Sequence, residues 1–90
     1  MTTIYADFEY VFDSVDFGID VRNWRTKHGM TQADFAEAMG GSYTGSYVSM
    51  IETANLSAGL PMRTFLVVCN LIDKSPFSYF ALQRAASENV

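Results

Sequence analysis

The sequence offers few side chains that could catalyse a reaction or bind a metal. It has a single histidine, His28, and no His/Cys cluster of the kind that binds zinc. We expect His28 to interact with the last carbonyls of a helix instead. The glycine-rich stretch GGSYTGS, residues 40–46, lacks the lysine of a phosphate-binding loop, and no carboxylate pair lies beside a plausible nucleophile. We therefore expect no enzyme activity, no cofactor and no metal.

Cys69 is the only cysteine, so no internal disulfide is possible. It lies on an apolar stripe with no basic neighbour to lower its pKa, which favours packing in the core over a reactive thiol. A chain without disulfides fits a reducing, cytoplasmic setting. No apolar run approaches the ~20 residues that span a membrane. The chain does not open with a basic region followed by an apolar run, so we expect no secretory signal. We expect no membrane partner.

The charge is unevenly distributed along the 90 residues, whose net charge is −4. Residues 1–20 hold five acidic groups and no Lys or Arg, while the rest holds six basic groups against five acidic ones. We expect an acidic N-terminal extension over 1–19 and a single small domain over 20–86. Nucleic-acid binding usually leaves a basic footprint, so only local patches could serve here.

The apolar residues of the first segment fit two patterns. They alternate with acidic ones, as in a strand, and they also form a helical stripe of Ile4, Phe8, Val11, Phe12 and Val15. We favour the helix, because Val15 extends the helical stripe. The alternative strand would be an exposed edge and an obvious dimer contact.

Gly18 interrupts this first pattern. Asp20 follows as a candidate N-cap for a helix over 21–28, because an acid is favourable at a helix N-terminus. Gly29 then supplies the left-handed residue that ends a helix.

Two more helices are expected from their caps. Thr31 and Asp34 have the spacing of a capping box, and Gly40 ends the helix that they begin. Thr44 or Ser46 can cap the third helix. Two glycines and two hydroxyl residues make the turn between these helices longer than the minimum.

Two prolines predict the last two helices. Pro61 suits the first position of a fourth helix, and Ser75-Pro76 has the pattern of a cap followed by a proline at the first position of a fifth. We expect Tyr79 to be available for a dimer contact, and three other residues to face inward: Phe77, Phe80 and Ala81. The predicted fold class is all-α, with five short helices and an uncertain N-terminal element.

A specific resemblance covers residues 20–80. They resemble the lambda-repressor/Cro-like helix-turn-helix family, often called the XRE family, whose third helix enters the major groove of DNA. The order and spacing match over about two-thirds of the chain, at the Arg22 region, Met30-Thr31-Gln32, Ala36, Met39-Gly40, Val48-Ser49, Ile51-Glu52 and Pro61.

The resemblance implies roles for several of these residues. Thr31 would cap a helix whose free N–H groups hold a phosphate. Gln32, at the same end, would donate a hydrogen bond to the DNA backbone. Glu52 commonly pairs with the basic residue of the first helix in this family, and Arg22 is the natural partner here.

The departures from the family pattern concern the DNA-reading helix. The turn is two residues longer, and Ala54 replaces the usual glycine. The expected outward residues are Gly45, Ser46, Tyr47, Ser49 and Met50. None of these makes the bidentate base contacts of Arg, Lys, Asn or Gln. The serines can read a base edge only weakly, while the tyrosine or methionine could touch a thymine methyl.

Phosphate contacts would have to come from residues around this helix. The candidates are Arg22, Arg25, Lys27, Arg63, Lys74 and Asn55. Such contacts position a protein on DNA without specifying a sequence. We therefore expect modest affinity that weakens strongly as salt rises.

Two functions follow from this reading. The first is a phage-like Cro or repressor that binds a palindromic operator in double-stranded DNA as a homodimer, with Gln32 on a phosphate and Tyr43, Thr44, Ser46 and Ser49 facing bases. The alternative is a protein-interaction module on the same fold. In that case the acidic first segment would bind another regulator or the basic groove of a nucleic-acid enzyme.

Overall fold

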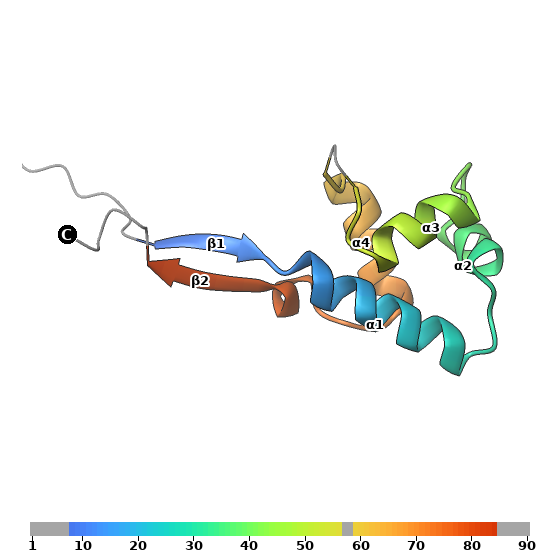
Figure 1. Cartoon of the computed structure of the whole chain (residues 1–90), viewed down its shortest axis with the longest axis horizontal. Helices are drawn as coiled ribbons and strands as arrows, with labels where there is room; N and C mark the ends of the chain where they lie inside the picture. Colours follow the sequence, from blue (N-terminus) through green and yellow to red (C-terminus); the bar gives the residue numbers. More distant parts are fainter. Residues whose placement is uncertain (1–7, 57–58, 85–90) are drawn as a thin grey trace, which may run out of the picture.

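The computed structural model describes residues 8–56 and 59–84. In these ranges the chain forms four α-helices, one turn of 3-10 helix and two strands (Figure 1). Expectations for Ile4 and the rest of 1–7, and for 85–90, lie outside the described residues. The elements in order are β1 (Phe8–Phe12), α1 (Ser14–Lys27), α2 (Gln32–Met39), α3 (Gly45–Glu52), α4 (Met62–Leu71), η1 (Pro76–Tyr79) and β2 (Phe80–Arg84).

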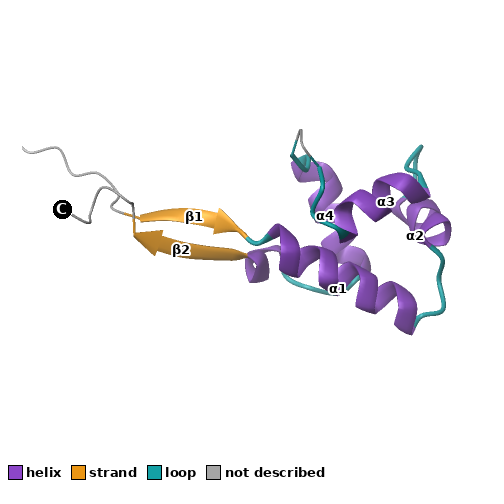
Figure 2. Cartoon of the chain, in the orientation of Figure 1, coloured by secondary structure: helices purple, strands orange, loops and turns teal. Residues whose placement is uncertain are grey.

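The helices form one body, and the strands project from it as an arm (Figure 2). Helix α3 packs against both α1 and α2, and α2 also contacts α4. The core between them is apolar and fully buried, which is how a chain of this size gains its stability. It consists of Phe17, Val21, Phe35, Ala36, Met39, Val48, Ile51, Phe65, Val68, Cys69, Ile72 and Tyr79.

The first segment is a strand, so the predicted helix is wrong over 8–12 and the alternative is confirmed there. Strand β1 pairs antiparallel with β2, with Phe12 opposite Phe80 and Tyr10 opposite Leu82. The ring of Phe12 lies 5.3 Å from the rings of both Phe80 and Phe65. The segment forms a strand because a partner strand about 70 residues away completes its backbone hydrogen bonds. The local sequence pattern does not reveal this partner.

Helix α1 begins at Ser14 and runs through the expected boundary near residue 20. The Asp13 carboxylate accepts the Asp16 N–H at 2.9 Å, so Asp13 is the N-cap and the expected cap at Asp20 is wrong. Gly18 lies inside the helix rather than interrupting it. A Cβ there would lie 2.5 Å from the carbonyl oxygen of Ile51, so glycine is what allows α1 to approach α3 so closely.

The fifth helix is also wrong. After the single turn η1 the chain extends into β2, and the fold is mostly helical with a small sheet rather than all-α. Phe77 is 84% exposed and Ala81 is exposed, whereas Tyr79 is only 2% exposed. The Tyr79 hydroxyl donates a 2.8 Å hydrogen bond to Asp20, and burial raises the pKa of this phenol. Tyr79 is therefore a core residue rather than a dimer contact.

The helix caps of the central pair are as predicted. Thr31 and Asp34 form a reciprocal capping box at the start of α2, and Gly40 ends that helix with a φ of 83°. The Thr44 hydroxyl accepts the Tyr47 N–H at 3.2 Å and caps α3. Correct caps fix where each helix begins, and hence which residues the turn contains.

Three smaller expectations also have clear outcomes. His28 lies at the end of α1, where its Nδ1 is 2.8 Å from the Trp24 carbonyl oxygen, as expected. Cys69 is buried, and this burial raises its pKa to about 11, which suits a packing role. Pro61 precedes α4 as its N-cap residue rather than occupying its first position.

Of the helices described, none is long and apolar enough to cross a bilayer.

Candidate nucleic-acid interface

Helices α2 and α3 form a helix-turn-helix whose second helix is held close to the first. Gly45 opens α3, and a Cβ on it would lie 3.2 Å from the backbone nitrogen of Ala33 in α2. Gly45 is therefore part of the contact between the two helices. Gly45 is half-buried, because its Cβ direction faces the α2 backbone while the rest of the residue reaches solvent.

The outward side of α3 is polar but uncharged. Ser46 and Met50 are exposed, while Ser49 and Tyr47 are half-buried. All five expected outward residues, including the half-buried Gly45, therefore reach solvent to some degree. The only charged residue of α3, Glu52, turns its carboxylate into the domain. This face can offer hydroxyl groups and a methionine methyl to a ligand, but no charge.

The long turn between α2 and α3 is tied to α4. The Tyr43 hydroxyl lies 2.8 Å from the hydroxyl of the buried Thr64, and its ring centroid is 5.5 Å from that of Tyr47. The two additional turn residues are thus accommodated by a specific tether. The Tyr43 hydroxyl therefore has a partner within the protein, while the residue as a whole is half-buried.

An ionic cluster fixes the C-terminal end of α3. The Glu52 carboxylate accepts hydrogen bonds from Arg25 Nε at 2.6 Å, from Arg25 Nη2 at 3.1 Å and from Gln32 Nε2 at 3.1 Å. Arg25 Nη1 also donates to the Met30 carbonyl oxygen at 2.9 Å. The side chains of Arg25 and Glu52 are 12% and 3% exposed, and the hydrogen bond with Glu52 raises the pKa of Arg25. One carboxylate therefore links α1, α2 and α3.

The partner of Glu52 is Arg25, so the prediction of Arg22 is wrong. Helical spacing could have identified it. Val21 is buried, and a residue four positions later lies on the same helix face, whereas a residue one position later does not. Arg25 is thus unsuited to the phosphate contact that the sequence suggested for it.

Exposed cations remain around the helix pair. Arg22 and Lys27 lie exposed on α1, Arg63 lies in the first turn of α4, and Lys74 follows that helix. Asn55, directly after α3, is also exposed. These groups remain suitable for phosphate contacts, because their side chains reach solvent.

Some acidic residues of the first segment have roles inside the domain. Asp13 caps α1, and Asp20 accepts the hydrogen bond from Tyr79. These two carboxylates stabilise the junction between the arm and the helical body. They are less suited to act as docking groups for a basic partner.

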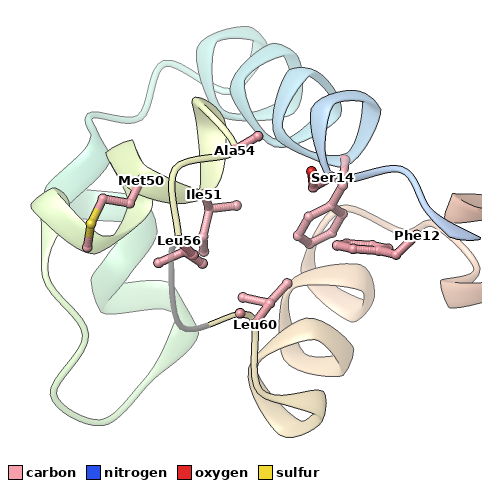
Figure 3. Close-up of a pocket in the computed structure, with 9 residues that line it drawn as sticks. Phe12, Ser14, Met50, Ile51, Ala54, Leu56 and Leu60 are labelled. Atoms are coloured by element: carbon pink, nitrogen blue, oxygen red, sulfur yellow. The ribbon is translucent and has the colours of Figure 1, made fainter.

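An apolar hollow of about 240 Å³ lies beside α3 (Figure 3). It opens between the start of α1, the end of α3 and the loop that leads to α4, and Ser14 supplies its one polar side chain. Ligand pockets need several convergent polar groups, and this hollow has no such set. In the described ranges, no group of His, Cys, Asp or Glu could hold a metal ion. The helix pair remains the best candidate site.

Comparisons with known proteins agree with this site. A family model described as helix-turn-helix matches residues 21–76, which contain α2, the turn and α3. The chain is similar to the crystal structure of the restriction-modification controller protein C.AhdI from Aeromonas hydrophila. The two share 28% sequence identity with a TM-score of 0.58, over 71% of this chain and 91% of that chain. No curated protein matches the chain.

Proposed function

The chain belongs to the lambda-repressor/Cro-like family of helix-turn-helix proteins, and from this premise we propose that it binds an operator as a homodimer in the manner of Cro or a repressor. At the coarser level, it is a DNA-binding transcriptional regulator. The observation that carries the finer proposal is the division of α3. Its C-terminal end is fixed by buried contacts, while its N-terminal half presents an uncharged polar face.

In this proposal the outward side of α3 enters the major groove, with its N-terminal end foremost. The hydroxyls of Ser46 and Ser49 contact base edges, and Met50 contacts a thymine methyl group. Thr44 and the backbone at Gly45 lie at the same end of the helix. Single hydroxyl contacts discriminate weakly, so each base pair contributes little to specificity and the shape of the DNA contributes more.

Gln32 positions the domain on the DNA backbone. Its amide donates one hydrogen to Glu52 at 3.1 Å, and an amide nitrogen carries two hydrogens. The second hydrogen, with the N–H groups that follow Thr31 at the start of α2, would bind a phosphate. The bond to Glu52 holds the amide in place before DNA arrives.

The exposed cations supply the electrostatic part of binding. Arg22, Lys27 and Arg63 are the candidates for phosphate contacts, together with the neutral Asn55. Each ionic contact to phosphate releases a counterion, so the slope of affinity against salt counts them. With so few cations and a net charge of −4, binding requires low to moderate salt.

A homodimer would place two α3 helices in successive major grooves. The half-sites of its operator would then lie about one helical turn apart. A palindromic operator follows directly from the twofold symmetry of such a dimer.

Selection from a randomised duplex library at low salt tests the proposal. We expect an enriched palindrome whose binding weakens as salt rises. Ser46→Glu, on the proposed reading face, should abolish that binding, because it places a carboxylate against DNA. Asn70→Glu is the matched control, since Asn70 is also exposed and uncharged but lies on α4, outside the helix-turn-helix. No enrichment by the folded protein would overturn the proposal and direct the search to protein partners.

A further inference from the structure

An exposed apolar surface lies where the arm meets the helical body. Phe77 is 84% exposed, Tyr10 73%, Met62 62% and Leu66 45%. With the half-buried Phe80, and with Phe65 and Pro76, these residues surround a hollow of about 810 Å³. Strands β1 and β2 pair antiparallel as in a hairpin, although the helical body and not a turn connects them, and we refer to this pair as the hairpin. We call the surface the hairpin–α4 face and define it by six residues: Tyr10, Met62, Leu66, Pro76, Phe77 and Phe80.

The hairpin–α4 face is large for so small a protein. Its four most exposed side chains leave on the order of 500 Å² open to water, if a large apolar side chain has roughly 200 Å² of surface. Monomeric proteins rarely expose contiguous apolar patches beyond a few hundred Å², and larger ones mark interaction sites. All seven side chains that line the hollow are apolar or aromatic, so a partner would bind by apolar contact rather than by charge.

The hairpin itself is only partly covered. At its inner end Phe12 packs on the body, with its ring 5.8 Å from Phe17 and 5.3 Å from Phe65. Two residues earlier, on the same side of the strand, Tyr10 is exposed. A sheet of two strands is marginally stable in water unless another layer covers it. Among the described residues, the helical body therefore covers the apolar side of the hairpin at Phe12 but leaves it exposed at Tyr10.

We propose that a second copy of this chain covers the hairpin–α4 face, and that this contact forms the regulator's dimer. An apolar surface without charges is suited to meet itself across a twofold axis, where the same patch serves both subunits. Stable interfaces bury about 800 Å² on each partner, and the four exposed side chains would supply more than half of this, about 500 Å², before the strand backbone is counted. In the dimer, Phe77 of each copy inserts into the hollow of the other.

The position of this face suits the helix-turn-helix. Figure 1 shows the hairpin at one end of the molecule and α2 and α3 at the other. Contact through the hairpin therefore leaves both α3 helices uncovered. Both strands lie outside residues 21–76, the part that matches the family model, whereas Met62, Leu66 and Pro76 lie within it. The choice of a second copy as occupant rests on the proposed operator-binding function.

Sedimentation equilibrium of the full chain over a wide concentration range, without DNA, tests the proposal. The protein should be a dimer, and Phe77→Glu should raise its dissociation constant at least about 30-fold, as expected for the anchor of an interface. Val15→Glu is the matched control, because Val15 is an exposed apolar residue on α1 away from the face. It should leave the dissociation constant unchanged. Met62→Lys should weaken the dimer as Phe77→Glu does, and circular dichroism should show that all variants are folded.

Three outcomes would overturn the proposal: a monomeric parent protein, a dimer that survives both Phe77→Glu and Met62→Lys, or an equal loss in Val15→Glu. None of these depends on whether the protein binds DNA. A dimer that fails to select an operator would instead overturn the proposed function and leave this interface standing.

Discussion

The two ends of α3 are built differently. At its C-terminal end, Glu52 accepts three hydrogen bonds from α1 and α2, and Gly18 brings the α1 backbone against its last carbonyls. At its N-terminal end, Gly45 rests on α2 less closely, with 3.2 Å from a Cβ to the Ala33 nitrogen, and Ser46 is exposed. One end is fixed by buried charge and close packing, and the other is left open and neutral.

This difference shows how a helix with weak reading groups could still place them. A hydroxyl contributes little to recognition unless it lies within hydrogen-bond distance of its target when the protein docks. In the proposed mode of binding, the fixed end sets the position and rotation of α3, so Ser46 and Ser49 do not need to be ordered on binding. The ionic cluster would then stabilise the orientation of α3 without itself facing the DNA.

The largest effect should follow from breaking the fixed end. Glu52→Ala leaves the Arg25 guanidinium, only 12% exposed, without its carboxylate. Removing one partner of a largely buried ion pair typically costs about 3 kcal/mol or more, because the remaining charge is uncompensated. Urea denaturation followed by circular dichroism measures this loss.

Glu37→Ala is the matched control for that variant. Glu37 is exposed on α2, and a surface substitution of this kind usually changes stability by less than about 0.5 kcal/mol. If both variants lost the same stability, the cluster would be a surface ion pair with no special role.

The next effect compares the glycines at the two ends. Gly18→Ala should lower the free energy of unfolding by about 2 kcal/mol, because its Cβ would lie 2.5 Å from the Ile51 carbonyl oxygen and the helices must separate. Gly45→Ala should cost less than about 1 kcal/mol, because the nearest atom is 3.2 Å away and alanine favours a helix. Thermal unfolding of both variants gives the difference, and equal losses would contradict the contrast between the ends.

How much of this could be predicted from the sequence depended on the range of the contacts involved. Thr31 and Asp34 form a capping box whose partners lie three residues apart, and it was predicted correctly; Thr44, which also bonds three residues on, was one of two candidates for the cap of α3. The helix-turn-helix was identified from its motif for the same reason. Strand β1, in contrast, pairs with residues about 70 positions away, and a local pattern that fits both a helix and a strand cannot choose between them.

The error at the C-terminus has a similar origin. Ser75-Pro76 does cap a helical turn, but no short-range signal says that the turn ends after four residues and continues as the partner of β1. The choice of Arg22 over Arg25 is an error of another kind, because the spacing of four residues from the apolar Val21 already favours Arg25 as the partner of Glu52. The hairpin–α4 face could not be predicted at all, because the fifth helix was expected to bury Phe77.

One substitution, directly after the C-terminal end of α3, should stabilise the protein. Helix α3 ends with the Asn55 N–H bonded to the Met50 carbonyl at 2.8 Å and the Ala54 N–H bonded to that of Ile51 at 3.1 Å. This ending requires a left-handed residue, and Ala54 occupies it with a φ of 55°. Ala54→Gly should therefore raise the free energy of unfolding by up to about 1 kcal/mol, measured by urea denaturation.

Ala38→Gly provides the opposite control. Ala38 is exposed in the last turn of α2, where the backbone is helical, so glycine there should cost up to about 1 kcal/mol. If both variants were destabilised, the φ at Ala54 would not be a source of strain.

The smallest effect concerns the cap of α2 and depends on pH. The Asp34 carboxylate accepts the Thr31 backbone N–H at 2.9 Å, and this hydrogen bond, with that of the Thr31 side chain, lowers the pKa of Asp34. A carboxyl whose pKa is lower in the folded state stabilises the fold above its unfolded pKa, about 3.9, and this contribution disappears as pH falls through the folded pKa. Asp34→Asn should therefore lower the melting temperature slightly at pH 6, and the difference from the parent protein should shrink toward pH 2.

Glu37→Gln, on the exposed side of the same helix, should show no such convergence. A difference for Asp34→Asn that stayed constant with pH would mean that the charge of Asp34 contributes nothing to the start of α2, and that the side-chain hydrogen bond alone fixes it.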